Sequence, residues 1–162
     1  MRWRGDGWLK GVRWVYSPNQ GGRPSNCEVS LIVLHNISLP PDDFCGNWVE
    51  RFFTNRLDPQ AHPYFSTIAR LQVSAHFLVR RDGRVIQFVG CDRRAWHAGQ
   101  SIWQGRENCN DYSVGIELEG SDSQSFTAEQ YAALWPLIRD LRARYPIRAL
   151  AGHCHVAPGR KT

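Results

Sequence analysis

Three residues stand where a hydrolytic metal site could be built: His35, His153 and Glu117. His35 ends the apolar run 30–35, His153 follows the apolar run 147–151, and Glu117 lies between them in the chain. Catalytic zinc takes imidazole or carboxylate ligands and keeps one coordination position open for water. A carboxylate beside such a metal can act as the general base that takes a proton from that water. The spacing alone leaves a structural or surface histidine as the ordinary alternative at each position.

The elements that would position these residues are strands of one central sheet. The run SLIVLH at 30–35 is continuously apolar, which is typical of a strand buried on both faces. Segment 113–119, SVGIELE, alternates, with its polar and small residues, Glu117 among them, on one face. Ligand sites in open α/β sheets gather at the carboxyl ends of strands. We therefore expect separate strand ends to bring the candidate ligands together.

A short helix and a hairpin are predicted between these strands. In residues 44–55, large aromatic side chains recur at helical intervals, and an aspartate of the preceding LPPDD segment (39–43) is expected to cap the helix. Two strand-like runs, 75–79 and 85–89, flank an Asp-Gly pair, which is a strong hairpin signal.

A second helix is predicted near the end of the chain. Thr127 and Gln130 have the spacing of a capping box, which opens a helix running to about residue 145. Pro136 lies inside this segment and is expected to kink or split the helix.

The composition suits one ordinary globular domain. The chain has 162 residues, is 42% hydrophobic and carries a formal charge of +5, which favours anionic partners. The basic residues are scattered, so we expect no nucleic-acid partner. Five widely spaced cysteines argue against a disulfide framework, and no apolar run reaches the length of a signal core or a membrane span. We expect a cytoplasmic protein with no membrane partner.

Whole segments of the chain resemble one family, the N-acetylmuramoyl-L-alanine amidases of the AmpD type. The segments are VLHNISLPPDDF (33–44), HPYF (62–65), VSAHFLVRRDGRVIQFV (73–89), RAWHAG (94–99), GRENCNDYSVGIELEG (105–120) and GHCHVAPGRKT (152–162). Those enzymes are cytoplasmic zinc hydrolases of cell-wall recycling that act on 1,6-anhydro-muropeptides. The resemblance implies an α/β (α+β) fold: one domain, residues 1–162, with a central mixed β-sheet flanked by helices, as in peptidoglycan recognition proteins and phage lysozyme-like amidases.

The resemblance also implies a role for each candidate residue. His35 and His153 become Zn²⁺ ligands, Glu117 becomes the general base, and Lys161 becomes the cation that stabilises the oxyanion. The family pattern continues GRKTD, and its Asp is the third ligand, but the sequence stops at Thr162. We expect a truncated sequence whose continuation restores this Asp; the alternative is a protein that ends here and binds zinc poorly.

His155 is a weaker substitute for the third ligand, because in an extended segment it would share a face with His153. Four further residues are expected to contact substrate. Asn36 follows a ligand, Trp96 could stack on a sugar face, His97 belongs to the same segment, and Arg106 could meet a peptide carboxylate. His76 reads instead as a hydrogen-bonded core histidine.

Two other functions share this fold. One is a non-catalytic module that binds muropeptides, since such proteins typically lose zinc ligands. Retention of Glu117 and Lys161 argues against it, because a pure binder needs neither a base nor an oxyanion cation. The other is a phage-type lytic amidase, which shares the chemistry but acts on intact wall. We expect a monomer that binds anhydro-muropeptide.

Overall fold

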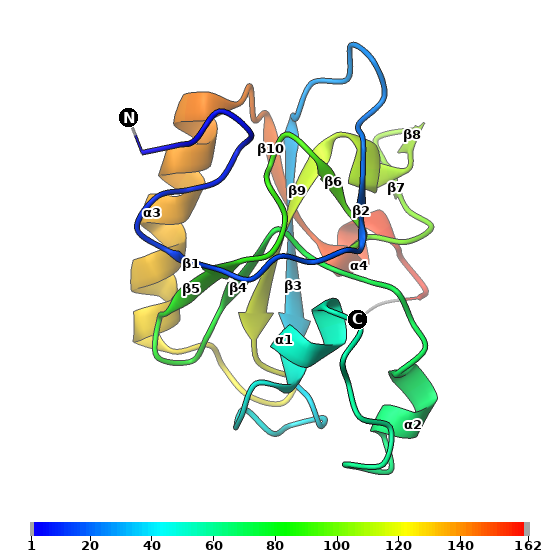
Figure 1. Cartoon of the computed structure of the whole chain (residues 1–162). Coiled ribbons are helices and arrows are strands. Elements are labelled where there is room, and N and C mark those ends of the chain that lie inside the picture. Colours follow the sequence, from blue (N-terminus) through cyan, green and yellow to red (C-terminus); the bar gives the residue numbers. More distant parts are fainter. Residues whose placement is uncertain (1, 161–162) are drawn as a thin grey trace.

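A six-stranded mixed sheet forms the centre of the computed structural model, which describes residues 2–160 (Figure 1). Its strand order is β1 (Arg13–Trp14), β5 (Val85–Gln87), β4 (Phe77–Val79), β9 (Ser113–Glu119), β3 (Leu31–Ile37) and β10 (Ala149–Gly152). Only the β4–β5 pair is antiparallel; the other neighbours run parallel. The mixed α+β sheet agrees with the fold expected from the sequence.

Smaller elements surround this sheet. Two short antiparallel pairs lie at its periphery: β2 (Gln20–Gly21) with β6 (Arg94–Ala95), and β7 (Ile102–Trp103) with β8 (Arg106–Glu107). The helices are α1 (Trp48–Phe53), α2 (Phe65–Ile68), α3 (Ala128–Arg144) and α4 (His153–Val156), with a 3-10 turn η1 at Cys109–Asp111. In Figure 1, the long helix α3 covers one face of the sheet, and α1 lies in front of the other.

Alternation along the two central strands divides the core between these faces. On β9, Val114, Ile116 and Leu118 pack in the cluster that includes the α3 residues Leu134 and Leu141. The opposite face of the sheet packs against α1 and α2 through a second apolar cluster, to which α1 contributes its two phenylalanines. β9 is therefore wholly buried, and β3 is buried at residues 31–33 and at His35, in agreement with the apolar run of β3.

The hairpin prediction is confirmed, although its strands are shorter than the apolar runs. β4 pairs with β5, and Leu78 lies opposite Ile86. The turn closes with a hydrogen bond from the Gly83 N–H to the Arg80 carbonyl, and Gly83 takes a φ of 79°. A positive φ at that position is the reason that an Asp-Gly pair marks such a turn.

The first predicted helix begins later than expected. α1 starts at Trp48 with Asn47 at its N-cap, so neither aspartate of the preceding loop caps it. Gly46 takes a φ of 76°, which is incompatible with a right-handed helix starting at residue 44. The Asp43 carboxylate instead accepts a hydrogen bond from the Cys45 N–H within the loop.

The capping box of α3 is confirmed. The Thr127 hydroxyl accepts a hydrogen bond from the Gln130 N–H, and the Gln130 side chain accepts one from the Thr127 N–H. The helix continues through Pro136 as one element, so of the two expected effects, a kink or a split, the split is wrong. Pro136 lacks the N–H that would bond the Ala132 carbonyl, and Ala132 lies on the exposed face, where water can solvate that carbonyl.

All five cysteines lie within the described residues and are free thiols. Within residues 2–160, no helix is long and apolar enough to cross a bilayer.

Gln130 generates a stability prediction, because its buried side chain does more than complete the cap. Its Nε2 donates to the carbonyls of Val79 and Glu119, at 3.1 and 2.9 Å, and so ties α3 to β4 and β9. Gln130→Leu should lower the free energy of unfolding by roughly 2–3 kcal/mol, because buried carbonyls lose their donor. Urea denaturation checks this. The exposed-face control Arg139→Gln should stay within about 0.5 kcal/mol of wild type, and equal stability of both variants would contradict the prediction.

Candidate metal centre and active-site cavity

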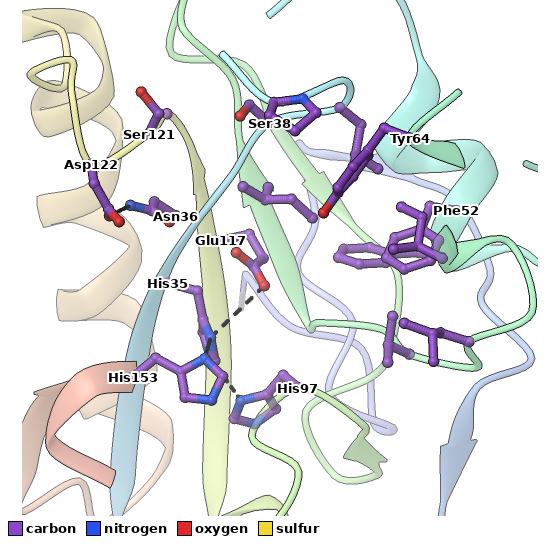
Figure 2. Close-up of a pocket in the computed structure, with 18 of the residues that line it drawn as sticks. His35, Asn36, Ser38, Phe52, Tyr64, His97, Glu117, Ser121, Asp122 and His153 are labelled. Atoms are coloured by element: carbon purple, nitrogen blue, oxygen red, sulfur yellow. Dashed lines mark hydrogen bonds and ion pairs between the residues drawn. The ribbon is translucent and has the colours of Figure 1, made fainter. Parts of the chain in front are cut away.

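His35 and His153 meet at the carboxyl end of the sheet. β3 and β10 run parallel, with Leu34 opposite Gly152, so the residue after each faces its counterpart across the pair. The two Nδ1 atoms lie 2.8 Å apart, and the rings form a T-shaped contact (Figure 2). His35 lies inside β3 rather than at its end, and His153 opens α4. The convergence of the two histidines that the sequence predicts is therefore present.

The hydrogen bonds around His35 fix which of its nitrogens carries the proton. Its Nε2 lies 2.9 Å from Nδ1 of His97, whose own Nε2 lies 3.1 Å from the Ser113 hydroxyl. That hydroxyl donates to the Cys109 carbonyl at 2.5 Å and therefore accepts from His97. Burial lowers the pKa of His97 well below its usual value, so the ring is neutral and its Nδ1 accepts from the His35 Nε2–H. The Nδ1 of His35 consequently carries a lone pair.

His153 is arranged in the same sense. Its Nε2 lies 3.3 Å from the Ala98 carbonyl, which can only accept, so Nε2 carries the proton and Nδ1 a lone pair. Two imidazole lone pairs thus converge on one point, where a bound cation would relieve their repulsion. This donor set fits a divalent metal that favours nitrogen ligands. Within residues 2–160, no group of three or more His, Cys, Asp or Glu side chains is arranged to hold a metal.

Glu117 stands beside this histidine pair. It lies directly opposite His35 in the parallel register of β9 and β3, and its Oε1 is 3.9 Å from the His35 Nδ1. Only 8% of the residue is exposed. A carboxylate next to the point where the lone pairs converge has the position that a general base requires. Glu119, two residues on, instead accepts from the Arg81 N–H and is structural.

A cavity of about 620 Å³ opens from the histidines and Glu117. One wall is apolar and aromatic and includes Phe52, Tyr64 and Trp96. Figure 2 shows Phe52 and Tyr64 across the cavity from the histidines and Glu117. The other wall is polar and is formed by Asn36 and by Ser121, Asp122 and Ser123 of the 120–123 loop. A cavity of this size, with a few polar groups on one side, suits an amphipathic ligand of several hundred daltons.

The four residues predicted to contact substrate fall into different places. Asn36 and Trp96 line the cavity, and the Asn36 amide donates to the Asp122 carboxylate at 2.7 Å. His97 also borders the cavity, but both of its ring nitrogens are engaged by His35 and Ser113, so it supports the centre. Arg106 does not line this cavity: it lies on β8 with its guanidinium 3.9 Å from the Tyr112 ring centroid.

The expectation for His155 rested on an extended segment, and that expectation was wrong. Residues 153–156 form α4, in which positions two apart lie on different sides. The His155 ring is exposed, and its Nδ1 accepts from the Gly152 N–H at 3.0 Å. It therefore caps the helix. Lys161, the predicted oxyanion cation, lies outside the described residues.

Sequence reasoning did not assign a role to Ser113 or Gly115. Both lie on the Glu117 face of β9, and a Cβ at Gly115 would overlap the His97 ring. The alternation of β9 already grouped them with Glu117, so the signal was present. The sequence could not show that the His97 ring packs against Gly115.

His76 confirms its interpretation as a core histidine. Its Nδ1 accepts from the Gly115 N–H, and its Nε2 donates to the Arg93 carbonyl, both at 3.0 Å. Burial, with the charge of Arg23 nearby, lowers the pKa of His76 to about 3. The residue stays neutral and holds the strand beside His97.

Comparison with known proteins places these features in a family context. Residues 25–162 match the family described as N-acetylmuramoyl-L-alanine amidase. The 1,6-anhydro-N-acetylmuramyl-L-alanine amidase AmpD of Citrobacter freundii is 54% identical over 159 residues, which is 97% of this chain and 85% of that protein. AmpD of Escherichia coli K12 is 53% identical over 158 residues, 96% of this chain and 86% of the relative.

Solved structures agree with this. The crystal structure of a selenomethionine derivative of AmpD superposes with a TM-score of 0.95 at 52% identity, over 100% of this chain and 91% of that one. The amidase AmiD from E. coli, in complex with anhydro-N-acetylmuramic acid-L-Ala-D-gamma-Glu-L-Lys, superposes with a TM-score of 0.61 at 30% identity. That match covers 86% of this chain and 54% of AmiD.

The buried histidines predict a pH dependence of stability. The folded-state pKa of His76 is about 3, below its usual 6.5. Between pH 3 and 6.5, His76 is therefore protonated in the unfolded chain and neutral in the folded protein. The free energy of unfolding should therefore be unaffected above pH 6.5 and fall as the pH drops towards 3, by up to about 1.4 kcal/mol per pH unit from this residue. Denaturation at several pH values and ¹⁵N NMR of the histidines check this. An imidazole of His76 that protonates in the folded protein near pH 6 would refute it.

Proposed function

Because the chain belongs to the N-acetylmuramoyl-L-alanine amidase family, we propose that it cleaves the amide bond between 1,6-anhydro-N-acetylmuramic acid and L-alanine with Zn²⁺ bound at His35 and His153. The chain is thus an amidase, and peptidoglycan recycling is the process in which such an activity serves. The observation that carries the zinc proposal is the convergence of the His35 and His153 Nδ1 atoms, 2.8 Å apart, beside a buried carboxylate.

The ligand set would be completed by one further protein group and a substrate or water position. We propose that a carboxylate is the third ligand, because in the amidase pattern this ligand is the aspartate that follows the GRKT motif. Two neutral imidazoles and one carboxylate are an established donor set for hydrolytic zinc, with a fourth position left for the reaction. The Nε2 hydrogen bonds of both histidines hold the rings in the orientation that such a centre needs.

Bound zinc supplies Lewis acidity, which polarises the scissile carbonyl and acidifies water. Glu117 removes the proton from the attacking water as it adds to the lactyl carbonyl. The same carboxylic acid then delivers that proton to the departing nitrogen of L-alanine, so that the C–N bond breaks and the carboxylate is regenerated. Its near-complete burial keeps this proton transfer away from bulk solvent.

The developing negative charge on the carbonyl oxygen needs a cation. Among residues 2–160, the cavity lining carries no lysine or arginine. We therefore propose Lys161, the lysine of the GRKT motif, as the group that stabilises the oxyanion. Trp96 offers a ring face to the sugar, and Asn36, held by Asp122, offers its amide oxygen to a donor of the substrate.

The substrate proposal rests on the relatives. The AmpD proteins named above are 1,6-anhydro-N-acetylmuramyl-L-alanine amidases and match almost the whole chain. AmiD and AmpDh3 have been solved with an anhydro-N-acetylmuramyl tripeptide and an anhydromuramic pentapeptide. We propose the same class of ligand here. We also propose a monomer in the cytoplasm, where the five free thiols stay reduced.

Metal removal tests the zinc proposal. Dialysis of the full-length protein against a chelator should abolish release of L-alanine-headed peptide from anhydro-muropeptide, and stoichiometric Zn²⁺ should restore it. Product release is followed by chromatography, and bound metal by mass spectrometry of the native protein. Turnover that persists after complete metal removal would reject a zinc mechanism. A parallel assay on whole sacculi separates the recycling activity from a lytic one, since a lytic amidase would solubilise them.

Replacement of the carboxylate tests the general base. Glu117→Gln should lower kcat by ~10²–10⁴-fold, because proton transfer is lost while the side chain keeps its size. Zinc content and product affinity should remain near wild type. The exposed carboxylate Glu107 supplies the control, and Glu107→Gln should leave kcat unchanged. A Glu117→Gln enzyme with wild-type kcat would exclude the proposed base, and a wild-type protein that binds muropeptide without turnover would favour a binding module.

A further inference from the structure

We infer that His97 and Ser113 form a relay that sets the metal-binding tautomer of His35. The inference rests on the proposed function, because a tautomer matters only where His35 binds a metal. Neither residue contacts the point between the two Nδ1 atoms. Both act through His35 and are positioning residues.

The donor and acceptor roles in the relay are set by a backbone carbonyl at one end. The Cys109 carbonyl can only accept, so it orients the Ser113 hydroxyl towards itself at 2.5 Å. The oxygen of Ser113 then accepts from the His97 Nε2–H, and the His97 Nδ1 accepts from the His35 Nε2–H. A backbone acceptor cannot reverse its role, so the chain of hydrogen bonds leaves the His35 Nδ1 deprotonated. A metal ligand at Nδ1 requires that state.

The His97 ring packs in a space that exists only because residue 115 is glycine. His97 is 9% exposed, and its ring lies against β9 at Gly115, where a Cβ would overlap three ring atoms. Gly115 lies between Ser113 and Glu117 on the same face of β9. Three successive positions of that face thus anchor the relay, make room for the ring and carry the proposed base.

The backbone next to His97 orients the second proposed ligand, His153. The Asn110 side-chain oxygen accepts from the N–H groups of His97 and Ala98, at 3.1 and 2.8 Å. This clamp holds the Ala98 carbonyl at 3.3 Å from the Nε2 of His153. One short segment therefore orients both proposed ligands, His35 through a side chain and His153 through a carbonyl.

Ser113 permits a matched experiment on zinc affinity, because Ser101 resembles it without joining the relay. Ser101 is also buried and bonds the same 3-10 turn, where its hydroxyl accepts from the Cys109 N–H at 3.1 Å. Full-length Ser113→Ala should bind Zn²⁺ about 10–100-fold more weakly in competition with a chromophoric chelator, because loss of such a partner has this effect on metal sites. Ser101→Ala should bind it with wild-type affinity. Equal zinc affinity of wild type and Ser113→Ala would overturn the inference.

A second pair of variants at His97 separates the hydrogen bond from packing. Asn carries its side-chain oxygen near the position of the imidazole Nδ1, so His97→Asn retains an acceptor for His35, whereas His97→Leu does not. His97→Leu should lose zinc affinity by ~10–100-fold, and His97→Asn should recover most of it. Two variants that bind zinc equally would show that the ring acts only by filling space and would overturn the inference.

The tautomer itself is observable. Long-range ¹H–¹⁵N correlation spectra should show His35 protonated only at Nε2 in the zinc-loaded wild type, and a mixture of tautomers in metal-free Ser113→Ala. His35 found protonated at Nδ1 in the metal-free wild type would contradict the relay. A wild-type protein that binds no zinc would refute the proposed function, and this inference with it, whereas normal zinc binding by Ser113→Ala and His97→Leu would refute the relay alone.

Discussion

The parallel pairing of β3 with β9 on one side and β10 on the other decides where every proposed reactive group lies. In this register, His35 faces Glu117 across one pair of strands and the start of α4 across the other. Parallel ladders fix their neighbours residue by residue, so a slip of one position would turn Glu117 into the α3 core. The remaining elements cover these strands and form the walls of the cavity.

Burial of polar groups gives the centre its rigidity. His35, His97 and Glu117 are each less than 10% exposed, and the two histidines make defined hydrogen bonds that a fluctuating site would lose. In a low-dielectric surrounding an unsatisfied donor is costly, so the tautomers form one consistent set. The backbone carbonyls of Cys109 and Ala98 are the final acceptors of these hydrogen bonds. Because both carbonyls can only accept, the Nε2 atoms of His35 and His153 carry the protons and the Nδ1 atoms do not. These contacts orient the two histidines that we propose as metal ligands.

The sequence by itself determined the main elements and the candidate centre. The apolar run of β3, the alternation of β9 and the capping box of α3 are local patterns, and all three appear in the structure. The two histidines and Glu117 were identified from their positions on those strands together with the family resemblance. The local patterns predict the wrong boundary or break where a single residue overrides them. Gly46 delays the start of α1, and α3 continues through Pro136 because the Ala132 carbonyl, which loses its partner there, lies on the exposed face.

Only the tertiary structure decided how the supporting residues act. His97 seemed a substrate residue because it neighbours Trp96, yet its ring turns inward to Ser113, sixteen positions along the chain. Arg106 and His155 looked available for ligands, but one stacks on an aromatic ring and the other caps a helix. Hydrogen-bond partners far apart in the chain are chosen by the packing of strands and loops. Residue type and spacing therefore name a candidate but leave its partner, and hence its role, open.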